Sequence, residues 1–390
     1  MKDIEDVFVT LKTGSNEARE KLPVHFGTTF RCVPHYGIYS DLEETIAGHR
    51  VLNALDDVTP AIVENHPDFT YYQHLQENGR EGFSEEQVAQ WSSAQSTEFG
   101  RDSPGWKLDK WKFLPLAEKA LAAKPDAKWF VFMETDTYIL WSNLLEWLSR
   151  FWSEYPYYIG VQMQIQETVF AYGGAGFILS NTALKMLVKK IKMNRRHYED
   201  YTGDHWAGDC VLGKVVEDAG MHLQWSWPNL LAEHPNDMDF DEHFSSPTSQ
   251  LWCHHVASYH HMLPEDIVQF YEFENKWRQM NGRTLRHKDV FRQYLLPQLA
   301  TLQANWDNLS GEVRDEKSSL EECRSLCESE EDCVQFSIAG PTCKTSTVIK
   351  LGRRSHTSGM EVNSGWMMDR VHQFMDRMDA SCWDEAWIDS

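Results

Sequence analysis

Two carboxylates lie one residue apart at the end of an apolar run. Residues 130–139 read FVFMETDTYI, so Glu134 and Asp136 follow a segment that is typical of a buried strand. Two carboxylates on such a loop can face one point and bind a hard divalent cation through oxygen. Either residue can instead cap a following helix, and the triplet alone leaves both interpretations open.

A glycine-rich segment, AYGGAGFILS at residues 171–180, contains Gly173, Gly174 and Gly176. Glycines at this density allow a backbone to approach a ligand closely, although a tight turn explains them as well. No Lys-Ser or Lys-Thr follows them, so the segment is not a P-loop.

Two later segments contain a candidate base and a candidate metal ligand. In GDHWAGDCVLGKVVEDAG (203–220), Asp209 precedes an expected amphipathic helix, where it can cap the helix or act as a base in a cleft. In LWCHHVASYHH (251–261), His254 follows an aromatic strand, where a histidine is either a structural residue or a third metal ligand.

The positions of these residues follow from the elements around them. Apolar runs that are typical of short strands alternate with helical segments, which predicts an α/β fold with a largely parallel sheet. Ligands of such sheets bind beyond the carboxyl ends of the strands, which is where the acidic pair lies. The expected strands are 7–11, 36–40, 128–133 and 157–164, and the expected helices are 116–124 and 144–152.

Composition excludes some function classes. The 390 residues carry 37 Lys and Arg against 59 Asp and Glu, a net charge of −22, which is the wrong sign for a nucleic-acid binder. Any phosphate must therefore be held by a few placed cations or by a metal. The 16 Trp residues suit a large core, although carbohydrate sites also use aromatic faces.

Four of the eight cysteines crowd into one short stretch. Cys323, Cys327, Cys333 and Cys343 have no C-x2-C pair and no histidine between them, so a disulfide module is favoured over a zinc site. Disulfides favour an oxidising compartment, and the sequon at Asn308 agrees with one. Sequence alone allows three pairings among these four cysteines and leaves the other four undecided.

These observations divide the chain into three parts. We expect a catalytic domain with closing helices at 1–305, a disulfide-stapled α+β module at 306–370 and a tail at 371–390. No run of 18 apolar residues occurs, so we expect no membrane segment in this sequence, and an anchor preceding Met1 in a longer protein stays open.

Taken in order, the segments resemble the β-1,3-glycosyltransferases of the fringe and core 1 β-1,3-galactosyltransferase kind, glycosyltransferase family 31. The resemblance covers roughly residues 7–260 and rests on several motifs at once. These motifs are VFVTLKTG (7–14), YSDLEE (39–44), WFVFMETDTYI (129–139), AYGGAGFILS (171–180), GDCVLG (208–213) and CHHV (253–256).

The resemblance implies a GT-A, Rossmann-like fold and an inverting transfer from a UDP-sugar to a glycan or glycoprotein acceptor, usually with Mn²⁺ (or Mg²⁺). The transferred sugar would be galactose, an N-acetylhexosamine or glucose, and the linkage β-1,3. It also implies a place in the secretory pathway, in the Golgi lumen or outside the cell. Donor sugar, acceptor identity and oligomeric state do not follow from the sequence.

Carried over residue by residue, the resemblance assigns the metal to Asp136 and His254 and the general base to Asp209. Gly173, Gly174 and Gly176 would border donor and acceptor. The residues implied on the nucleotide-sugar side are Thr13, Asp41, Lys112, Glu134 and Thr135.

Two departures from the family pattern stand out. Where many relatives have three Asp in a row, this chain has Glu-Thr-Asp, so Glu134 matches only approximately. Where relatives usually have an acid directly before the base, this chain has Gly208. A catalytically degenerate carbohydrate-binding protein on the same fold is therefore the alternative to an enzyme.

The cysteine cluster resembles a PAN or apple-type module, a family that binds protein or carbohydrate. That resemblance implies the disulfides Cys323–Cys343 and Cys327–Cys333. Both a stabilising cap and an acceptor-binding role are open for this module.

Overall fold

The computed structural model describes residues 3–87, 104–243, 250–316, 319–355, 361–382 and 387–388. Within these ranges no helix is both long and apolar enough to cross a bilayer. The chain forms two compact units. The first takes Met1–Ala232, Ala257–Glu272 and Ile388–Ser390, and the second takes Glu233–Val256 and Phe273–Trp387.

The first unit is built on an eight-stranded mixed sheet. Its strands, in the order in which they pair, are β11 (Leu223–Trp225), β7 (Tyr158–Gly160), β10 (Phe177–Ser180), β5 (Trp129–Glu134), β1 (Val7–Lys12), β2 (Tyr36–Ser40), β4 (His49–Asn53) and β3 (Glu44–Ile46). Strand β1 is parallel to β2 and to β5, whereas β10 is antiparallel to β5 and β7. The sequence predicted a more parallel sheet. Strand β10 follows β7 after a hairpin, a connection that makes neighbouring strands antiparallel.

Two small strand pairs accompany this sheet. The hairpin between β7 and β10 consists of β8 (Gln162–Ile165) and β9 (Thr168–Ala171), and β6 (Tyr138–Ile139) pairs antiparallel with β12 (Ser258–Tyr259). The expected strand at 157–164 is thus divided between β7 and β8.

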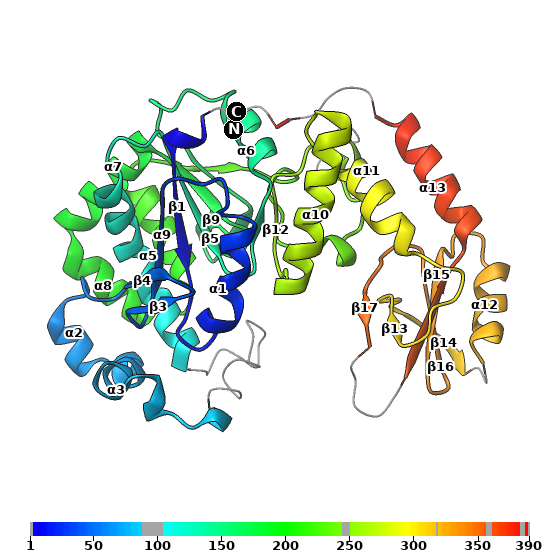
Figure 1. The fold of residues 1–390 in the computed structure, drawn as a ribbon, viewed down its shortest axis with the longest axis horizontal. Coiled ribbons are helices and arrows are strands. Elements are labelled where there is room, and N and C mark those ends of the chain that lie inside the picture. Colours follow the sequence, from blue (N-terminus) through cyan, green and yellow to red (C-terminus); the bar gives the residue numbers. More distant parts are fainter. Residues whose placement is uncertain are drawn as a thin grey trace. The chain divides into compact units, whose positions relative to one another are not determined.

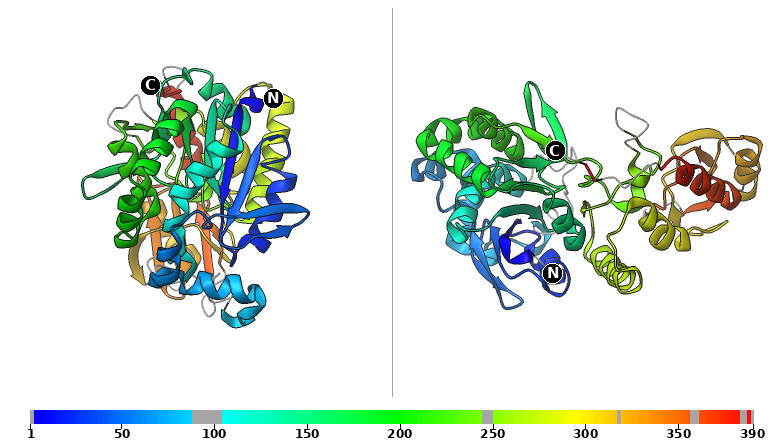
Figure 2. Two further views of the ribbon diagram at one scale, coloured as in Figure 1. Left: turned by 90° about the vertical axis from the view of Figure 1, so that its left-hand side faces the viewer. Right: turned by 90° about the horizontal axis from the view of Figure 1, so that it is seen from above.

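Helices cover the sheet of the first unit (Figure 1; Figure 2). Every residue of β1 is buried, as expected of a central strand covered on both faces. Leu108, Leu187 and Val215 join Phe130 in the main apolar core, which packs α5, α7 and α9 together on the sheet. The helices of this unit are α1 (Ala18–Gly27), α2 (Pro60–Asn65), α3 (Thr70–Asn78), α5 (Pro104–Ala123), α6 (Trp141–Leu148), α7 (Asn181–Met193), α8 (Arg195–Asp204) and α9 (Gly208–Asp218).

The second unit contains an antiparallel four-stranded sheet. Its strands, in pairing order, are β14 (Glu312–Glu316), β16 (Thr342–Ser346), β15 (Gln335–Ala339) and β18 (Val362–Trp366). A further pair joins β13 (Trp306–Asp307) to β17 (Arg353–Arg354). The helices are α11 (His287–Val290), α12 (Leu320–Ser329) and α13 (Met368–Ala380), and α10 (Pro264–Asn281) runs across the division of the chain.

Three disulfides lie in the second unit: Cys253–Cys382, Cys323–Cys343 and Cys327–Cys333. The last two are the pairs that the PAN-type resemblance implies. Among the described residues, Cys32 and Cys210 are free thiols. The disulfide of Cys253 joins the 233–256 segment to Cys382, just after α13, within the second unit.

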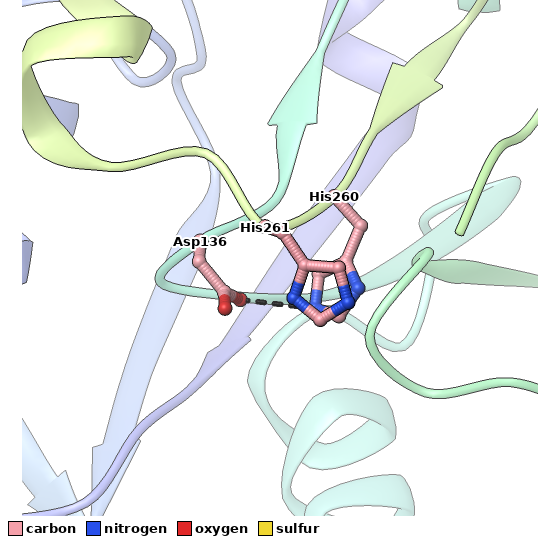
Figure 3. Close-up of side chains that lie close together, drawn as sticks. All are labelled: Asp136, His260 and His261. Atoms are coloured by element: carbon pink, nitrogen blue, oxygen red, sulfur yellow. Dashed lines mark ion pairs between the residues drawn. The ribbon is translucent and has the colours of Figure 1, made fainter. Parts of the chain in front are cut away.

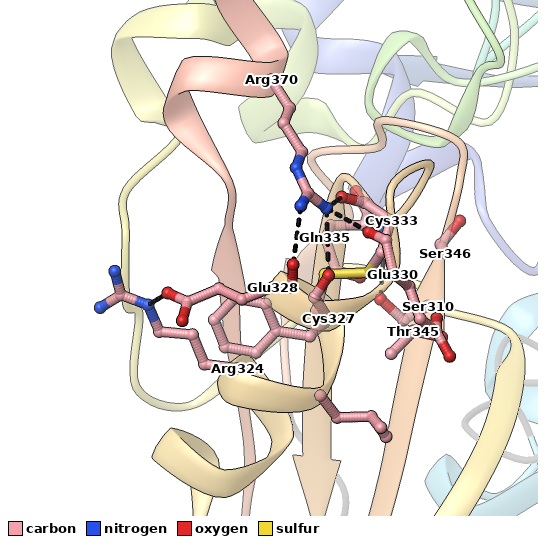
Figure 4. The surroundings of a disulfide bond; sticks show 12 residues. Ser310, Arg324, Cys327, Glu328, Glu330, Cys333, Gln335, Thr345, Ser346 and Arg370 are labelled. Atoms are coloured by element: carbon pink, nitrogen blue, oxygen red, sulfur yellow. Dashed lines mark hydrogen bonds and ion pairs between the residues drawn. A yellow bond between two sulfur atoms is a disulfide. The ribbon is translucent and has the colours of Figure 1, made fainter.

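Arg370 of α13 fixes the end of α12 (Figure 4). Its guanidinium donates hydrogen bonds to the carbonyl oxygens of Cys327, Glu328, Glu330 and Cys333 at 2.6–3.0 Å. The last carbonyls of a helix have no partner within the helix, and a cation at this end is also favoured by the helix dipole. One side chain therefore holds a helix end and the small disulfide loop together.

Asn308 is fully buried although it belongs to the sequon. Its amide nitrogen donates to the carbonyl oxygens of Phe336 and Gly365, at 3.1 and 3.3 Å, and its amide oxygen accepts from the Ser310 hydroxyl at 2.8 Å. Because an unpaired buried amide is costly, these bonds make Asn308 a structural residue of the module.

Candidate functional site

The loop after β5 is a tight, internally bonded turn. The backbone N–H of Thr137 donates to the carbonyl of Glu134 at 3.2 Å, and the Thr137 hydroxyl accepts from the N–H of Glu134 at 3.1 Å and donates to the carbonyl of Gly174 at 2.8 Å. The buried His25 ring lies 2.8 Å from the carbonyl oxygen of Thr135. The turn holds Thr135 and its two acidic neighbours in one conformation.

Asp136, His260 and His261 form a three-residue cluster at this turn (Figure 3). One ligand atom of each lies within 4.8 Å of the other two, and Oδ1 of Asp136 is 3.2 Å from Nε2 of His260. A carboxylate with two imidazoles is a donor set that suits Mn²⁺ or another transition metal better than Mg²⁺, which prefers oxygen and water. The residues present therefore fit a divalent transition metal, a class that includes Mn²⁺.

Strand pairing brings the histidines to the acid. In the β6–β12 pair, Tyr259 lies opposite Tyr138, so the residues after Tyr259 run alongside the residues before Tyr138. The backbone N–H of Met262 accordingly donates to the carbonyl oxygen of Asp136 at 2.9 Å. His260 and His261 lie next to Asp136 because of this antiparallel register.

Burial and charge set the protonation of the cluster. Burial alone would raise the pKa of Asp136, but the neighbouring His260 lowers it well below its ordinary value. Burial alone would lower the pKa of His260, and Asp136 raises it instead. The His260 Nδ1 lies 3.3 Å from the carbonyl oxygen of Ala232, an arrangement that orients Nε2 toward Asp136.

His261 has an unusual backbone. Its φ of 59° is in the left-handed region, which non-glycine residues rarely adopt. Such strain concentrates at functional sites, where the surrounding structure imposes it. Here it accompanies an exposed imidazole next to a buried one.

The glycine segment lies against this cluster. A Cβ on Gly174 would be 2.3 Å from Cε1 of His260, so only glycine permits the close approach of this backbone to the ring. Gly176 has φ +79°, a conformation that favours glycine, and the Cβ of Gly173 would lie 3.4 Å from Oε1 of Glu134. All three predicted glycines thus border the acidic turn.

Glu134 belongs to a different cluster from Asp136. Lys12 is its partner in the β1–β5 register, and the Lys12 Nζ lies 3.0 Å from Glu134 Oε1 and 2.5 Å from Asp109 Oδ2. Burial and the nearby carboxylates raise the pKa of Glu134, while Lys12 lowers it. The two acids of the triplet are therefore not equivalent.

The predicted nucleotide-side residues form a buried network at the ends of β1 and β2. The Lys112 Nζ donates to the carbonyl oxygen of Thr13 at 2.8 Å and lies 3.8 Å from Asp41 Oδ1. Asp41 accepts from the backbone N–H and the hydroxyl of Ser15, at 2.6 and 2.9 Å. Burial would raise the pKa of Asp41, but Lys112 and Ser15 lower it. Asp41 and Lys112 thus fix the loop from the inside.

Glu17 and Lys21 of the first helical segment were missed in the sequence. The hydroxyls of Thr13 and Thr135 both donate to Glu17 Oε1, at 3.2 and 3.3 Å. Lys21 pairs with Glu17 at 2.8 Å; burial would lower its pKa, but Glu17 and, next, Asp136 raise it. Lys21 is thus a cation beside the metal cluster, and the only sequence signal was its place after a strand and its KT turn.

Asp209 lies in the first turn of α9. Its Oδ2 accepts from the backbone N–H of Gly173 at 3.0 Å, which ties the helix start to the glycine segment. Burial of the carboxyl raises the pKa of Asp209 to about 6. A carboxylate with such a pKa can accept a proton near neutral pH.

The departure at Gly208 has a steric cause. A Cβ at this position would lie 2.5 Å from the Cα of Lys110 and 2.7 Å from its carbonyl oxygen. Backbone atoms cannot move aside as a side chain does, so the close packing of α9 on α5 excludes an acidic side chain directly before Asp209.

His254 lies elsewhere. It belongs to the second unit, whereas Asp136 belongs to the first, and the cluster at Asp136 contains His260 and His261 in its place. His254 is buried, and its carbonyl accepts from the N–H of His287 at 2.9 Å. The sequence contains both histidine pairs in LWCHHVASYHH, and the available signal was the short strand-forming run VASY before the second pair.

Comparisons with known proteins identify the family of the chain. The Fringe-like family matches residues 2–276. The chain is also 26% identical over 160 residues to a glycoprotein-N-acetylgalactosamine 3-beta-galactosyltransferase 1 of Xenopus laevis, a match that covers 36% of this chain and 44% of that protein. The chain thus spans less than half the length of that relative. Because the family match covers well over half of this sequence, the chain belongs to the Fringe-like family.

Proposed function

We propose that this protein is an inverting, metal-dependent glycosyltransferase that moves a sugar from a UDP-sugar to a hydroxyl of a glycan acceptor. The observation that carries the proposal is the Asp136, His260 and His261 cluster at the carboxyl end of β5 in a Fringe-like chain. A β-1,3 linkage and galactose, N-acetylhexosamine or glucose as the transferred sugar belong to the same proposal, and the galactosyltransferase relative favours galactose.

Asp136, His260 and His261 would hold the divalent cation, which we propose is Mn²⁺. A bound divalent cation supplies Lewis-acid stabilisation of the negative charge that develops on the departing diphosphate. Lys21 adds a positive charge next to the cluster. The bound cation, with Lys21 beside it, would supply the positive charge that a protein of net charge −22 needs to bind a diphosphate.

Asp209 would act as the general base. It accepts the proton of the acceptor hydroxyl while the hydroxyl oxygen attacks the anomeric carbon and the bond to UDP breaks. One attack of this kind inverts the anomeric centre, so no side chain serves as a nucleophile. The hydrogen bond from Gly173 keeps the carboxylate in place.

The remaining residues would bind and orient the donor. Asp41 and Lys112 keep the loop of Thr13 in place for the nucleotide, and Thr135 lies between the two clusters. Glu134, paired with Lys12, would orient ribose or water and not bind the metal.

We further propose a glycoprotein acceptor and the secretory pathway, either in the Golgi lumen or outside the cell. The three disulfides favour an oxidising compartment, and the relative's name specifies a glycoprotein substrate. The module with Cys323–Cys343 and Cys327–Cys333 fits a PAN-like cap or acceptor-binding domain.

The alternative is a sugar-binding protein without activity. The ion pair between Glu134 and Lys12 favours it, because this pair engages one of the two carboxylates of the acidic triplet. One experiment separates the two. We expect UDP-galactose hydrolysis by the purified protein to require Mn²⁺ and to be lost in Asp136→Ala, while Asp126→Ala, at a side chain 78% exposed in the same unit, keeps it. Hydrolysis that is indifferent to Mn²⁺ and to Asp136→Ala would contradict the proposed site, and absence of hydrolysis with every UDP-sugar would favour the binding protein.

A further inference from the structure

Three aromatic rings, two of which lie shortly before Asp209 in sequence, have near-parallel planes. Trp106 and Trp206 have ring centroids 6.1 Å apart with planes 12° apart, and His205 stacks on Trp206 with the same distance and angle. We call these three residues the aromatic platform. Trp206 is 46% exposed, so burial in the core does not explain it as it explains a tryptophan such as Trp111.

Two elements connect the platform to the proposed site. Trp206 comes three residues before Asp209, in the turn that leads into α9. Trp106 lies on α5, on the same helix face as Asp109 and Phe113, because residues three and seven positions apart share a face. Asp109 pairs with Lys12, and the Phe113 ring is 4.5 Å from the Lys12 Nζ. This face of α5 therefore runs from the site to the platform.

Hydrogen bonds hold the turn that carries His205 and Trp206. The Lys110 Nζ donates to the carbonyl oxygens of Gly203 and His205, at 3.0 and 2.9 Å. The N–H of Ala207 donates to Nδ1 of His205 at 3.0 Å. A surface that is ordered before binding loses less entropy on binding.

We infer that the aromatic platform binds the flat face of a pyranose ring in the acceptor glycan. The face of an aromatic ring is electron-rich, and the axial C–H groups on one face of a hexose are weakly positive, so the two surfaces attract and also exclude water. The proposal rests on the proposed function, since the position beside Asp209 makes the bound sugar an acceptor. It adds the chemical class that the acceptor site selects, a sugar with one unobstructed C–H face.

Binding can be tested without transfer. Saturation-transfer NMR with the methyl α- and β-glycosides of galactose, N-acetylgalactosamine and glucose measures contact of each sugar with the protein. We expect the wild type to saturate the ring protons of at least one glycoside, and Trp206→Ala to weaken that binding about tenfold or more, as a central aromatic anchor does. Trp206→Phe keeps a ring and should retain most of it.

The matched control is Trp225→Ala. Trp225 is also 46% exposed and lies in the same unit, and its substitution should leave glycoside binding unchanged. Thermal unfolding of each variant separates a lost contact from a lost fold. Wild-type protein that saturates no glycoside, or Trp206→Ala that binds as well as wild type, overturns the platform.

The two proposals fail separately. Glycoside binding that depends on Trp206, in a protein without Mn²⁺-dependent UDP-sugar hydrolysis, supports the platform as a sugar site and contradicts the transferase. Hydrolysis by the wild type together with unchanged glycoside binding in Trp206→Ala contradicts the platform and leaves the transferase.

Discussion

The burial of Asp209 predicts how the rate of transfer depends on pH. The base works only when it is deprotonated, so with a pKa of about 6 the active fraction falls as the pH drops. We expect kcat/KM at saturating Mn²⁺ to decline tenfold per pH unit below about pH 6. An ordinary aspartate would remain ionised down to about pH 4.

Replacement of the same residue checks its role. Asp209→Asn should keep UDP binding, measured by calorimetry, and lower transfer by ~10² to 10⁴. Near wild-type transfer by this variant would remove Asp209 as the base.

The two histidine pairs make opposite predictions for metal binding. His261→Ala removes one of three clustered ligand atoms, and we expect it to weaken Mn²⁺ binding about 100-fold or more, since even outer-shell losses cost 10 to 100-fold. His254→Ala should leave Mn²⁺ affinity unchanged. Electron paramagnetic resonance of Mn²⁺ titrations measures both affinities. The reverse outcome would support His254 as the metal ligand, as the family resemblance implies.

The sequence pattern alone was enough to find Asp136 but not the histidines that lie beside it. Asp136 follows an apolar run and was found from that pattern, because strand ends can be read locally. His260 reaches the same point only through the register of a two-residue strand. Strands this short leave almost no periodic signal, so a sequence with two adjacent histidine pairs does not tell which pair arrives at the acid.

At the scale of elements, the glycine segment sets the distance between a strand turn and a histidine. Gly174→Ala places a methyl group 2.3 Å from the His260 ring, so the ring must shift away from Asp136. We expect weaker Mn²⁺ binding and a loss of about 1 to 3 kcal/mol in the free energy of unfolding.

The control for this substitution is Gly27→Ala. A Cβ at Gly27 meets nothing within 4 Å, and its backbone suits alanine. Calorimetric unfolding with and without Mn²⁺ compares the two variants. Equal Mn²⁺ affinities in both would show that the close contact at Gly174 does not position His260.

The elements of the first unit were largely predictable, and their directions less so. Parallel strands β2, β1 and β5 end at one edge, so Asp41, Thr13 and Glu134 all lie at or just after strand ends on that edge. The antiparallel β10 was not foreseen, because its apolar run FILS fits either direction. Direction depends on the connection, and the preceding hairpin lacks the turn dipeptides that mark one in a sequence.

At the scale of the whole molecule, each of the two units is built from segments that are not consecutive in the sequence. The sequence placed one boundary at residue 305, after a polar stretch, as composition suggests. In the structure the second unit takes residues 233–256 and 273–387, where Cys253 bonds to Cys382 and the ring centroids of Trp252 and Phe374 lie 5.5 Å apart. The spacing of cysteines in the sequence does not predict a disulfide between residues so far apart, and no local sequence pattern indicates it.

The buried Asn308 places folding and glycan attachment in competition. Both hydrogens of its amide are donated inside the module, so a sugar on that nitrogen would break a bond and could not fit. A cellular enzyme can modify this sequon only while the segment is still unfolded. We expect secreted, soluble protein to show no mass shift after treatment with an amidase that removes N-glycans, and any glycosylated form to be confined to the retained, insoluble fraction. A glycan on Asn308 would then identify chains that were glycosylated before this segment folded.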